Sequence, residues 1–348
     1  MSLRENIQFM PPPLPKLDPK EEHFFISSSI AGLKLFLRYL PAHAAFSGRA
    51  KPVLFVHGGT FPSALSIAHP FNGHSWRDEL VDAGFDVWGL DFQGFGASDP
   101  YPEMSLPAEN KPALGQAAAA SHQLERAVRF ICEHHHVPRI SIIAHSWGTI
   151  AAGLFAGRCP ELIERLAFFA PIAWRQKKAE PQIYPAWRVV TLKEQWDRFT
   201  QDVPPGQPAV LNRQDFDEWG ELYLDTDAAS RSRSPAGVKI PSGPWQDIAL
   251  AGAGQIAYDP ADIRAPVGII RGEWDKASTD TDACWLFDAL KNSPVRRAVK
   301  ISRATHLLHL EESRFALYRE TEAFLKGNDL PGQLPVHKNK PKEKICSP

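Results

Sequence analysis

The sequence RISIIAHSWGTI, at residues 139–150, decides the fold class of this chain. Its first half is a short apolar run, which is typical of a strand buried on both faces. The run TIAAGLFAGRC at 149–159 predicts a helix. Ser146 lies between the two, in Ala144-His145-Ser146-Trp147-Gly148. A serine on a strained turn from strand to helix projects its Oγ above the sheet. The sequence therefore predicts a nucleophile at Ser146.

The predicted turn also constrains the neighbours of Ser146. Its close backbone contacts require small residues two positions before and two positions after the serine, as Ala144 and Gly148 are. The helix that begins here would direct its positive end toward a developing oxyanion. The alternative role of Ser146 is a simple helix N-cap. Three further features of the chain favour the nucleophile.

The first feature is the loop Val56-His57-Gly58-Gly59-Thr60, at the end of the buried strand pattern PVLFVHGG. A loop in this position provides one backbone N–H group to an oxyanion hole, and the residue after the nucleophile provides the other. We expect these two donors to be Gly59 and Trp147. Thr60 and Phe61 are alternatives to Gly59.

The second feature is DFQGFGASD at 91–99, directly after another strand pattern. It resembles the D-x-x-G-x-G-x-S turn that is common in α/β-hydrolases, where its role is structural. Asp91 is therefore not expected to be catalytic.

The third feature is an acid and a base in the chain order Ser…Asp…His. Asp275 terminates the strand pattern VGIIRGEW, and His306 follows the next strand pattern. In this arrangement His306 takes the proton from Ser146, and Asp275 orients the imidazole and stabilises its charged form. Glu273, two residues earlier on the same strand, is an alternative acid. His309 is a weaker alternative base, and we expect it to be exposed or to cap a helix.

Strand and helix patterns alternate along most of the chain, which predicts an α/β fold with a mostly parallel central sheet and helices on both faces. The predicted strands lie at 23–40 (a hairpin), 52–59, 86–93, 139–146, 165–172, 267–274 and 296–304. The predicted helices lie at 74–84, 115–136, 149–159, 282–292 and 313–325.

This alternation defines the expected domain organisation. Residues 23–172 and 263–326 form the core, and residues 173–262 interrupt it with an aromatic-rich insertion that we expect to be a lid. A proline-rich arm (1–22) precedes the core and a flexible tail (327–348) follows it.

The lid prediction leaves the roles of individual side chains open. We expect one or two of the five tryptophans at 174, 187, 196, 219 and 245 to contact substrate. Arg188, Arg198 and Arg213 could bind a substrate carboxylate, but surface roles are the main expectation.

Together these motifs resemble the α/β-hydrolase superfamily over roughly residues 25–325, near bacterial esterases, meta-cleavage C–C hydrolases and proline iminopeptidases. The glycine-proline pair usual in the iminopeptidases is absent, since Thr60 and Phe61 follow Gly59. Ser146 also stands where haloalkane dehalogenases and epoxide hydrolases carry an aspartate nucleophile.

The resemblance implies a serine hydrolase that forms an acyl-enzyme, with no cofactor and no metal. The expected substrate is a carboxylic ester of small to medium size and apolar character. C–C bond or amide hydrolysis, acyl transfer and non-catalytic small-molecule binding are the alternatives.

Composition narrows the expected partners to a small-molecule substrate. A formal net charge of −1 argues against nucleic acid and anionic membranes. No apolar run approaches the ~20 residues of a membrane span, and residues 1–22 lack the apolar segment of a signal peptide. The four scattered cysteines favour a reducing compartment, so we expect the cytoplasm. His134, His135 and His136 point in different directions on a helix, which argues against a metal site.

Overall fold

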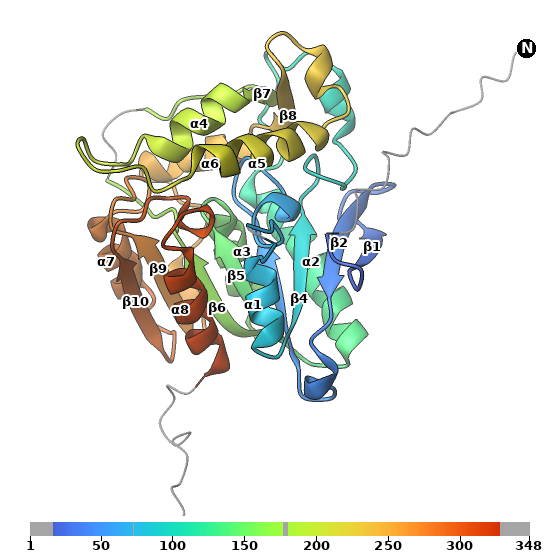
Figure 1. Ribbon diagram of the computed structural model, residues 1–348, viewed down its shortest axis with the longest axis vertical. Coiled ribbons are helices and arrows are strands. Elements are labelled where there is room, and N and C mark those ends of the chain that lie inside the picture. The colour runs from blue at the N-terminus through green and yellow to red at the C-terminus, as the bar shows by residue number, and fades with distance from the viewer. Residues whose placement is uncertain (1–16, 72, 177–179, 328–348) are drawn as a thin grey trace, which may run out of the picture.

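The computed structural model describes residues 17–71, 73–176 and 180–327 (Figure 1). Its centre is an eight-stranded sheet with the order β1-β2-β4-β3-β5-β6-β9-β10. The first two strands pair antiparallel with their neighbours, and all other pairs are parallel, as predicted. The strands are β1 (Glu22–Ser27), β2 (Lys34–Leu40), β3 (Lys51–Val56), β4 (Phe85–Asp91), β5 (Ile140–His145), β6 (Ile163–Phe169), β9 (Val267–Gly272) and β10 (Arg296–Ile301).

Helices cover both faces of this sheet, which confirms the predicted architecture. In Figure 1, α1 and α8 lie in front of the sheet, where they contact each other. The helices α2 and α3 pack together on the opposite face, and α7 contributes to the same core as they do. The bounds are α1 (Trp76–Asp82), α2 (Ala117–His135), α3 (Gly148–Arg158), α7 (Asp280–Ala289) and α8 (Arg314–Lys326).

The apolar run in β5 is buried on both faces because helices cover both faces of the sheet. Ile142 and Ala144 belong to one hydrophobic core, whereas Ile143 belongs to the other. Successive side chains of a strand point to opposite faces, so a strand covered on both sides must be apolar at every position. Burying an isoleucine side chain contributes roughly 1.5–3 kcal/mol. This burial holds β5 rigid at the point where Ser146 leaves it.

The segment between β6 and β9 contains regular elements that the sequence patterns did not reveal. Residues 173–262 are called the insertion below, and its described parts, 173–176 and 180–262, lie above the sheet in Figure 1. The strands β7 and β8 form a separate antiparallel pair. The elements are β7 (Trp187–Thr191), α4 (Leu192–Thr200), α5 (Arg213–Asp225), β8 (Gly237–Pro241) and α6 (Gly243–Gly252).

A local signal for one of these helices was present in the sequence. Thr191 and Glu194 form a capping box at the start of α4, in which each side chain accepts from the other residue's backbone N–H. The pattern T-x-x-E before a helix is the known signature of this motif. It marks the beginning of α4 at Leu192.

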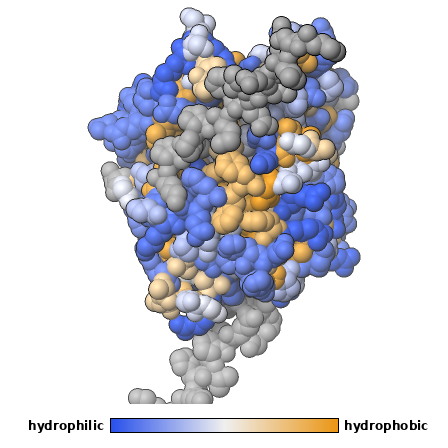
Figure 2. All heavy atoms as spheres, turned by 90° about the vertical axis from the view of Figure 1, so that its right-hand side faces the viewer, coloured by the Kyte–Doolittle hydropathy of each residue, from blue (hydrophilic) through white to orange (hydrophobic). Residues whose placement is uncertain are grey.

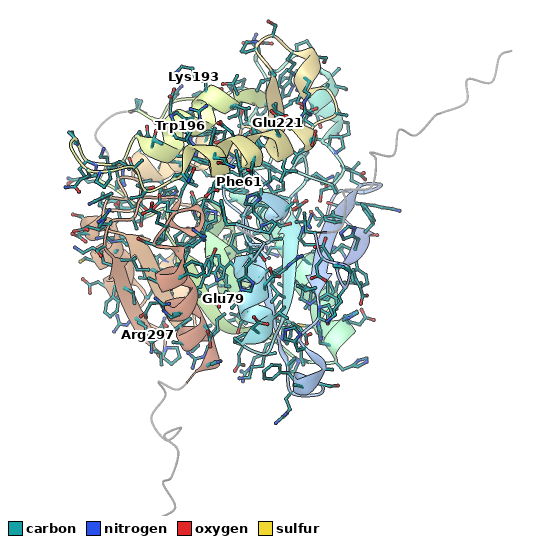
Figure 3. All side chains as sticks on the ribbon, in the orientation of Figure 1. Phe61, Glu79, Lys193, Trp196, Glu221 and Arg297 are labelled. Carbon is teal, nitrogen blue, oxygen red and sulfur yellow. The ribbon has the colours of Figure 1, made fainter. Side chains whose placement is uncertain are left out.

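Aromatic packing joins the insertion to the core. The ring of Phe61, in the loop after β3, lies 5.8 Å from Phe199 of α4 and 5.2 Å from Trp219 of α5. Trp219 also donates a 2.9 Å hydrogen bond from its indole to the carbonyl of Leu65. Figure 3 labels Phe61 at this junction between the sheet and the helices above it.

The predicted arm and tail lie mostly outside the described residues. At the described end of the arm, Glu21 is fully buried, and its carboxylate pairs with the guanidinium groups of Arg38, at 2.8 Å, and Arg77. Burial alone would raise the pKa of Glu21, but a hydrogen bond from His23 and the two arginines lower it to about 2. This segment is therefore tied to the core by a buried ionic cluster.

Figure 2 shows the face on the right-hand side of Figure 1, which is mostly hydrophilic around one hydrophobic area. None of the helices in the described ranges is long and apolar enough to cross a membrane.

Candidate active site

Ser146 lies on a tight turn between β5 and α3. Its backbone φ is 55°, in the left-handed region that non-glycine residues rarely adopt. The turn is held by a 3.0 Å hydrogen bond from the Ser146 N–H to the carbonyl of Phe169. A Cβ added at Gly148 would overlap the carbonyl oxygen of His57. This contact explains why glycine stands two residues after the serine.

The three predicted residues Ser146, His306 and Asp275 form one hydrogen-bonded chain. The Oγ of Ser146 lies 2.8 Å from Nε2 of His306. The other ring nitrogen, Nδ1, lies 2.9 Å from Oδ2 of Asp275. A carboxylate only accepts, so Nδ1 carries the proton and Nε2 accepts from the serine hydroxyl. All three residues are buried.

The carboxylate of Asp275 is fixed by its own loop. It follows β9, and its Oδ1 accepts 2.8 Å hydrogen bonds from the backbone N–H groups of Ala277 and Ser278. Parallel strands place their carboxyl ends at one edge of the sheet. Loops that follow β5, β9 and β10 therefore meet there, although they are far apart in sequence.

The rival acid Glu273 lies elsewhere. Its side chain is exposed, and its Oε2 accepts a 3.1 Å hydrogen bond from the backbone N–H of Arg303. The structure thus brings Asp275, and not Glu273, to His306.

The expectation that His309 is exposed or caps a helix is wrong. The chain after His306 turns into a short 3-10 helix, Leu308–Leu310, whose side chains are all buried. The ring of His309 stacks on Phe61 and lies 4.6 Å from the ring of His145. Burial lowers the pKa of His309 to about 3, so this imidazole is neutral.

The loop after β3 passes directly beside the serine turn. A Cβ added at Gly58 would lie 3.1 Å from Nδ1 of His145 and 3.2 Å from Cβ of Ser146. Within the described residues, the backbone N–H groups of Gly59, Thr60 and Trp147 donate to no protein acceptor. These three N–H groups are therefore free to bind a ligand, and Gly59 and Trp147 remain the donors that the sequence predicts for an oxyanion.

A buried carboxylate behind His306 escaped sequence analysis. Glu311 accepts a 2.9 Å hydrogen bond from the backbone N–H of Thr305 and another from the Thr305 hydroxyl. Burial raises the pKa of Glu311 to about 7. These two bonds anchor the loop that presents His306. The acidic pair in HLEES was the available signal, but a carboxylate near a helix start is usually exposed.

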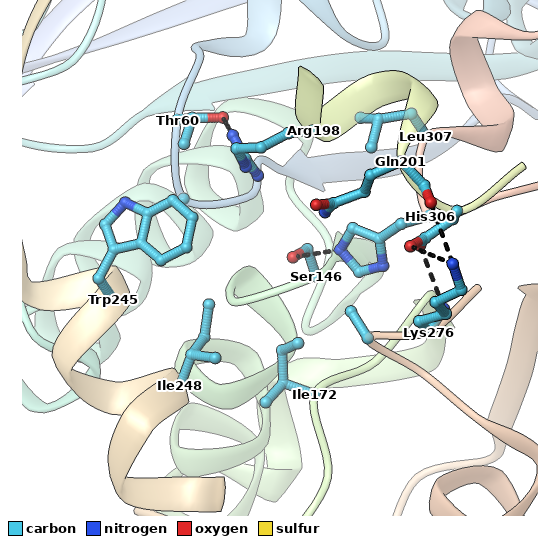
Figure 4. Close-up of a pocket in the computed structure, with 13 residues that line it drawn as sticks. Thr60, Ser146, Ile172, Arg198, Gln201, Trp245, Ile248, Lys276, His306 and Leu307 are labelled. Carbon is cyan, nitrogen blue, oxygen red and sulfur yellow. Dashed lines mark hydrogen bonds and ion pairs between the residues drawn. The ribbon is translucent and has the colours of Figure 1, made fainter. Parts of the chain in front are cut away.

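A cavity of about 390 Å³ opens onto the hydroxyl of Ser146 (Figure 4). Of the five tryptophans in the insertion, Trp245 lines it. Sequence analysis did not identify the polar residues on its other side, Gln201, Asp202 and Lys276. The complete lining is Gly59, Thr60, Ser146, Ile172, Arg198, Gln201, Asp202, Trp245, Ile248, Lys276, Ala277, His306 and Leu307.

The three arginines singled out in the insertion differ in their surroundings. Arg213 is exposed and pairs with Asp217 at 2.9 Å. Arg188 pairs with Glu194 at 3.0 Å. Arg198 lines the cavity beside Ser146, so the expectation of a surface role is wrong for this residue.

No group of three or more His, Cys, Asp or Glu side chains in the described ranges is placed to hold a metal ion. The expectation that the histidines point in different directions is wrong for His134 and His135, whose ring centroids lie 4.9 Å apart and which both pack against Trp88.

Comparison with known proteins agrees with this architecture. The family model described as alpha/beta hydrolase fold matches residues 51–313. The lysosomal acid lipase/cholesteryl ester hydrolase of Macaca fascicularis is 26% identical over 123 residues, which are 35% of this chain and 31% of that protein. The chain therefore matches about a third of the length of this curated relative.

Two solved structures show the same fold. A thermophilic esterase from Thermogutta terrifontis has a TM-score of 0.53 at 18% identity, covering 88% of this chain and 98% of that one. The epoxide hydrolase VrEH1 from Vigna radiata has a TM-score of 0.56 at 14% identity, with the same coverage. The family match spans most of the chain, which therefore belongs to the alpha/beta hydrolase fold family.

Proposed function

We propose that the chain is a serine hydrolase that cleaves a carboxylic ester through an acyl-enzyme. The observation that carries this proposal is the chain of hydrogen bonds from Ser146 Oγ through His306 to Asp275. A serine hydroxyl is a weak nucleophile until an adjacent base accepts its proton. His306 is in place to do so, because its unprotonated nitrogen, Nε2, faces the Ser146 hydroxyl.

In the acylation step, Ser146 Oγ attacks the ester carbonyl carbon while His306 takes the hydroxyl proton. The carbonyl oxygen becomes an oxyanion, which accepts hydrogen bonds from the backbone N–H groups of Gly59 and Trp147. The C–O bond to the alcohol then breaks, and His306 returns the proton to the leaving oxygen. Asp275 stabilises the imidazolium in between.

In the deacylation step, a water molecule attacks the acyl carbon, and His306 accepts its proton. The second oxyanion collapses, the bond to Ser146 Oγ breaks, and the serine recovers its proton from His306. The carboxylic acid leaves. No atom of the protein is consumed, and the cycle needs no metal or cofactor.

The names of the similar proteins favour ester hydrolysis over the other reactions that a Ser-His-Asp triad can catalyse. The curated relative is named as a lipase and ester hydrolase, and one structural neighbour is an esterase. Ile172, Ile248 and Leu307 provide the cavity with an apolar wall for an acyl or alcohol chain.

We also propose that the insertion acts as a lid. It contributes Arg198, Trp245 and Ile248 to the lining of the cavity that holds Ser146. Substrate would therefore be enclosed between the insertion and the core.

The free thiols of Cys132, Cys159 and Cys284 support a reducing compartment such as the cytoplasm.

The test is hydrolysis of p-nitrophenyl esters of increasing chain length by the wild type and the Ser146→Ala variant. We expect kcat to fall by at least ~10³-fold in the variant. A fluorophosphonate should label the wild type at Ser146 and leave the variant unlabelled. Ser278→Ala is the matched control, because the Ser278 hydroxyl is buried and has no hydrogen-bond partner in the described part of the chain. Labelling that persists in Ser146→Ala would refute the proposal.

A further inference from the structure

Arg198 brings a positive charge into the cavity beside the proposed nucleophile. It extends from α4, and its side chain lines the same cavity as Ser146 and His306. In the view of Figure 4, its guanidinium lies between Trp245 and the Ser146–His306 pair. Its position relative to the reacting serine makes it a candidate contact for substrate.

The partners of this guanidinium are neutral. Nη1 donates to the hydroxyl of Thr60 at 3.0 Å and to Oε1 of Gln195 at 2.9 Å. The guanidinium carbon lies 4.9 Å from the centre of the Trp245 ring. Within the described ranges, Arg198 forms no ion pair with a carboxylate. Burial, with a further effect of Arg188, lowers the pKa of Arg198 to about 10, so it remains charged at neutral pH.

The free edge of the guanidinium has a defined geometry. Both hydrogen bonds to Thr60 and Gln195 use Nη1. The Nε–H and the adjacent Nη2–H are therefore left without a protein acceptor in the described part of the chain. These two parallel donors match the two oxygens of one carboxylate, which makes a bidentate pair.

The other cations around the cavity are already engaged. The Lys276 ammonium donates to the carbonyl of Gln201 at 3.0 Å and lies 4.0 Å from a carboxylate oxygen of Asp202. Arg188 pairs with Glu194. A guanidinium that is partly buried without a counter-charge is costly, and an anionic ligand would remove that cost.

We propose that the ester substrate carries a carboxylate, which pairs with the Nε and Nη2 donors of Arg198 while Ser146 attacks the ester carbonyl. This inference rests on the serine hydrolase function proposed above and narrows its substrate class. The chain between the two groups would lie against Ile172, Ile248 and Leu307. A monoester of a short dicarboxylic acid is the simplest molecule with this chemistry.

Arg198 could instead act only by positioning the loop of the oxyanion donors, because it bonds to Thr60, next to Gly59. The two roles have different kinetic signatures. Loss of a substrate contact affects carboxylated esters alone and mainly KM. Loss of a positioning contact lowers kcat for every ester.

The experiment compares mono-p-nitrophenyl esters of succinic, glutaric and adipic acid with neutral p-nitrophenyl esters of matched chain length. We expect the wild type to prefer one carboxylated ester by ~10-fold or more in kcat/KM. Arg198→Gln should lower kcat/KM for that ester by 10- to 100-fold, mostly through a higher KM. It should change kcat/KM for the neutral ester by less than about twofold. These factors correspond to a charge-assisted hydrogen bond. Arg198→Lys keeps the positive charge but lacks the two parallel N–H donors, so it should recover part of the lost kcat/KM.

Arg213→Gln is the matched control, since it removes an exposed arginine of the insertion, and it should leave both esters unaffected. An equal loss on both esters, reproduced by Thr60→Val, would overturn the substrate role and assign Arg198 to positioning. Equal kcat/KM values for carboxylated and neutral esters in the wild type would also overturn it. The proposed hydrolase function fails separately, if the wild type turns over neither kind of ester.

Discussion

The indole Nε1 of Trp147 donates a 2.7 Å hydrogen bond to Oδ2 of Asp247. This bond joins the residue after the proposed nucleophile to helix α6 of the insertion. The same carboxylate oxygen accepts a 2.6 Å hydrogen bond from the backbone N–H of Ala117, at the start of α2. One buried carboxylate thus connects the serine turn, the insertion and a core helix.

Asp247→Ala should destabilise the protein and reduce activity together. The change leaves the buried donors of Trp147 and Ala117 without an acceptor, at a cost of about 1–3 kcal/mol each. Urea unfolding should show a loss of ~3 kcal/mol in the free energy of unfolding. Asp217→Ala, on the exposed face of α5, is the control and should change it by less than ~0.5 kcal/mol.

A double-mutant cycle with Trp147→Phe isolates the indole–carboxylate bond. Its coupling energy should be about 1 kcal/mol or more. Strict additivity of the two substitutions would show that this bond does not connect the serine turn to the insertion.

Asp275→Asn should lower kcat by ~10³- to 10⁴-fold, because an amide no longer fixes the productive tautomer of His306. Stability should change little, since the amide oxygen can still accept from the Ala277 and Ser278 N–H groups. Steady-state kinetics on a p-nitrophenyl ester measures the effect. Glu273→Gln, at the rival acid, should keep kcat within about twofold. Comparable losses in both variants would contradict the assignment of Asp275.

Glu21 should make the protein more stable above pH 4.5 than below it. Its pKa is about 2 in the folded protein, against an ordinary value of 4.5. The unfolded chain therefore binds more protons as the pH falls from 4.5 toward 2, and stability is lost over this window. Between pH 7 and pH 4 the loss from this one group is about 1 kcal/mol.

Glu21→Gln tests this contribution. At pH 7 it should lower the free energy of unfolding by about 3–5 kcal/mol, because Arg38 and Arg77 stay buried without their counter-charge. The difference from wild type should shrink as the pH falls to 4. Glu22→Gln, at the exposed neighbouring position, should behave like the wild type. A constant difference at all pH values would rule out the ionic role of Glu21.

His309 should make the protein less stable as the pH falls from 7.5 to 5, a higher pH range than that of Glu21. Its pKa is about 3 in the folded protein, so the native state does not take up the proton that the unfolded chain binds below pH 6.5. The free energy of unfolding should therefore fall by about 2 kcal/mol between pH 7.5 and pH 5 from this group. His69, whose pKa burial lowers to about 4, acts in the same direction.

Urea unfolding of His309→Leu at these two pH values measures that contribution. The variant should lose about 2 kcal/mol less than the wild type on acidification. His43→Leu, at an exposed histidine, is the control and should retain the wild-type dependence. An unchanged pH dependence in His309→Leu would show that His309 is not the buried neutral group described here.

The sequence by itself determined the fold class and the members of the candidate triad. Buried strands are readable as short apolar runs, because both of their faces must be apolar in a sheet covered on both sides. The residues at the ends of such strands then share one edge of the sheet. For that reason the sequence predicts the triad Ser146, Asp275 and His306. Their hydrogen-bonded arrangement depends on neighbouring residues that the sequence pattern does not specify.

Tertiary structure alone decided the surroundings of these residues. Trp147 and Asp247 are 100 positions apart, and Thr60 and Arg198 are 138 apart. Local periodicity carries no information about contacts over such separations. The burial of His309 follows from its packing against Phe61 and His145, and the charge of Arg198 beside the cavity follows from how the insertion packs on the core. The sequence therefore predicts which groups can react, and the packing of distant segments decides what surrounds them.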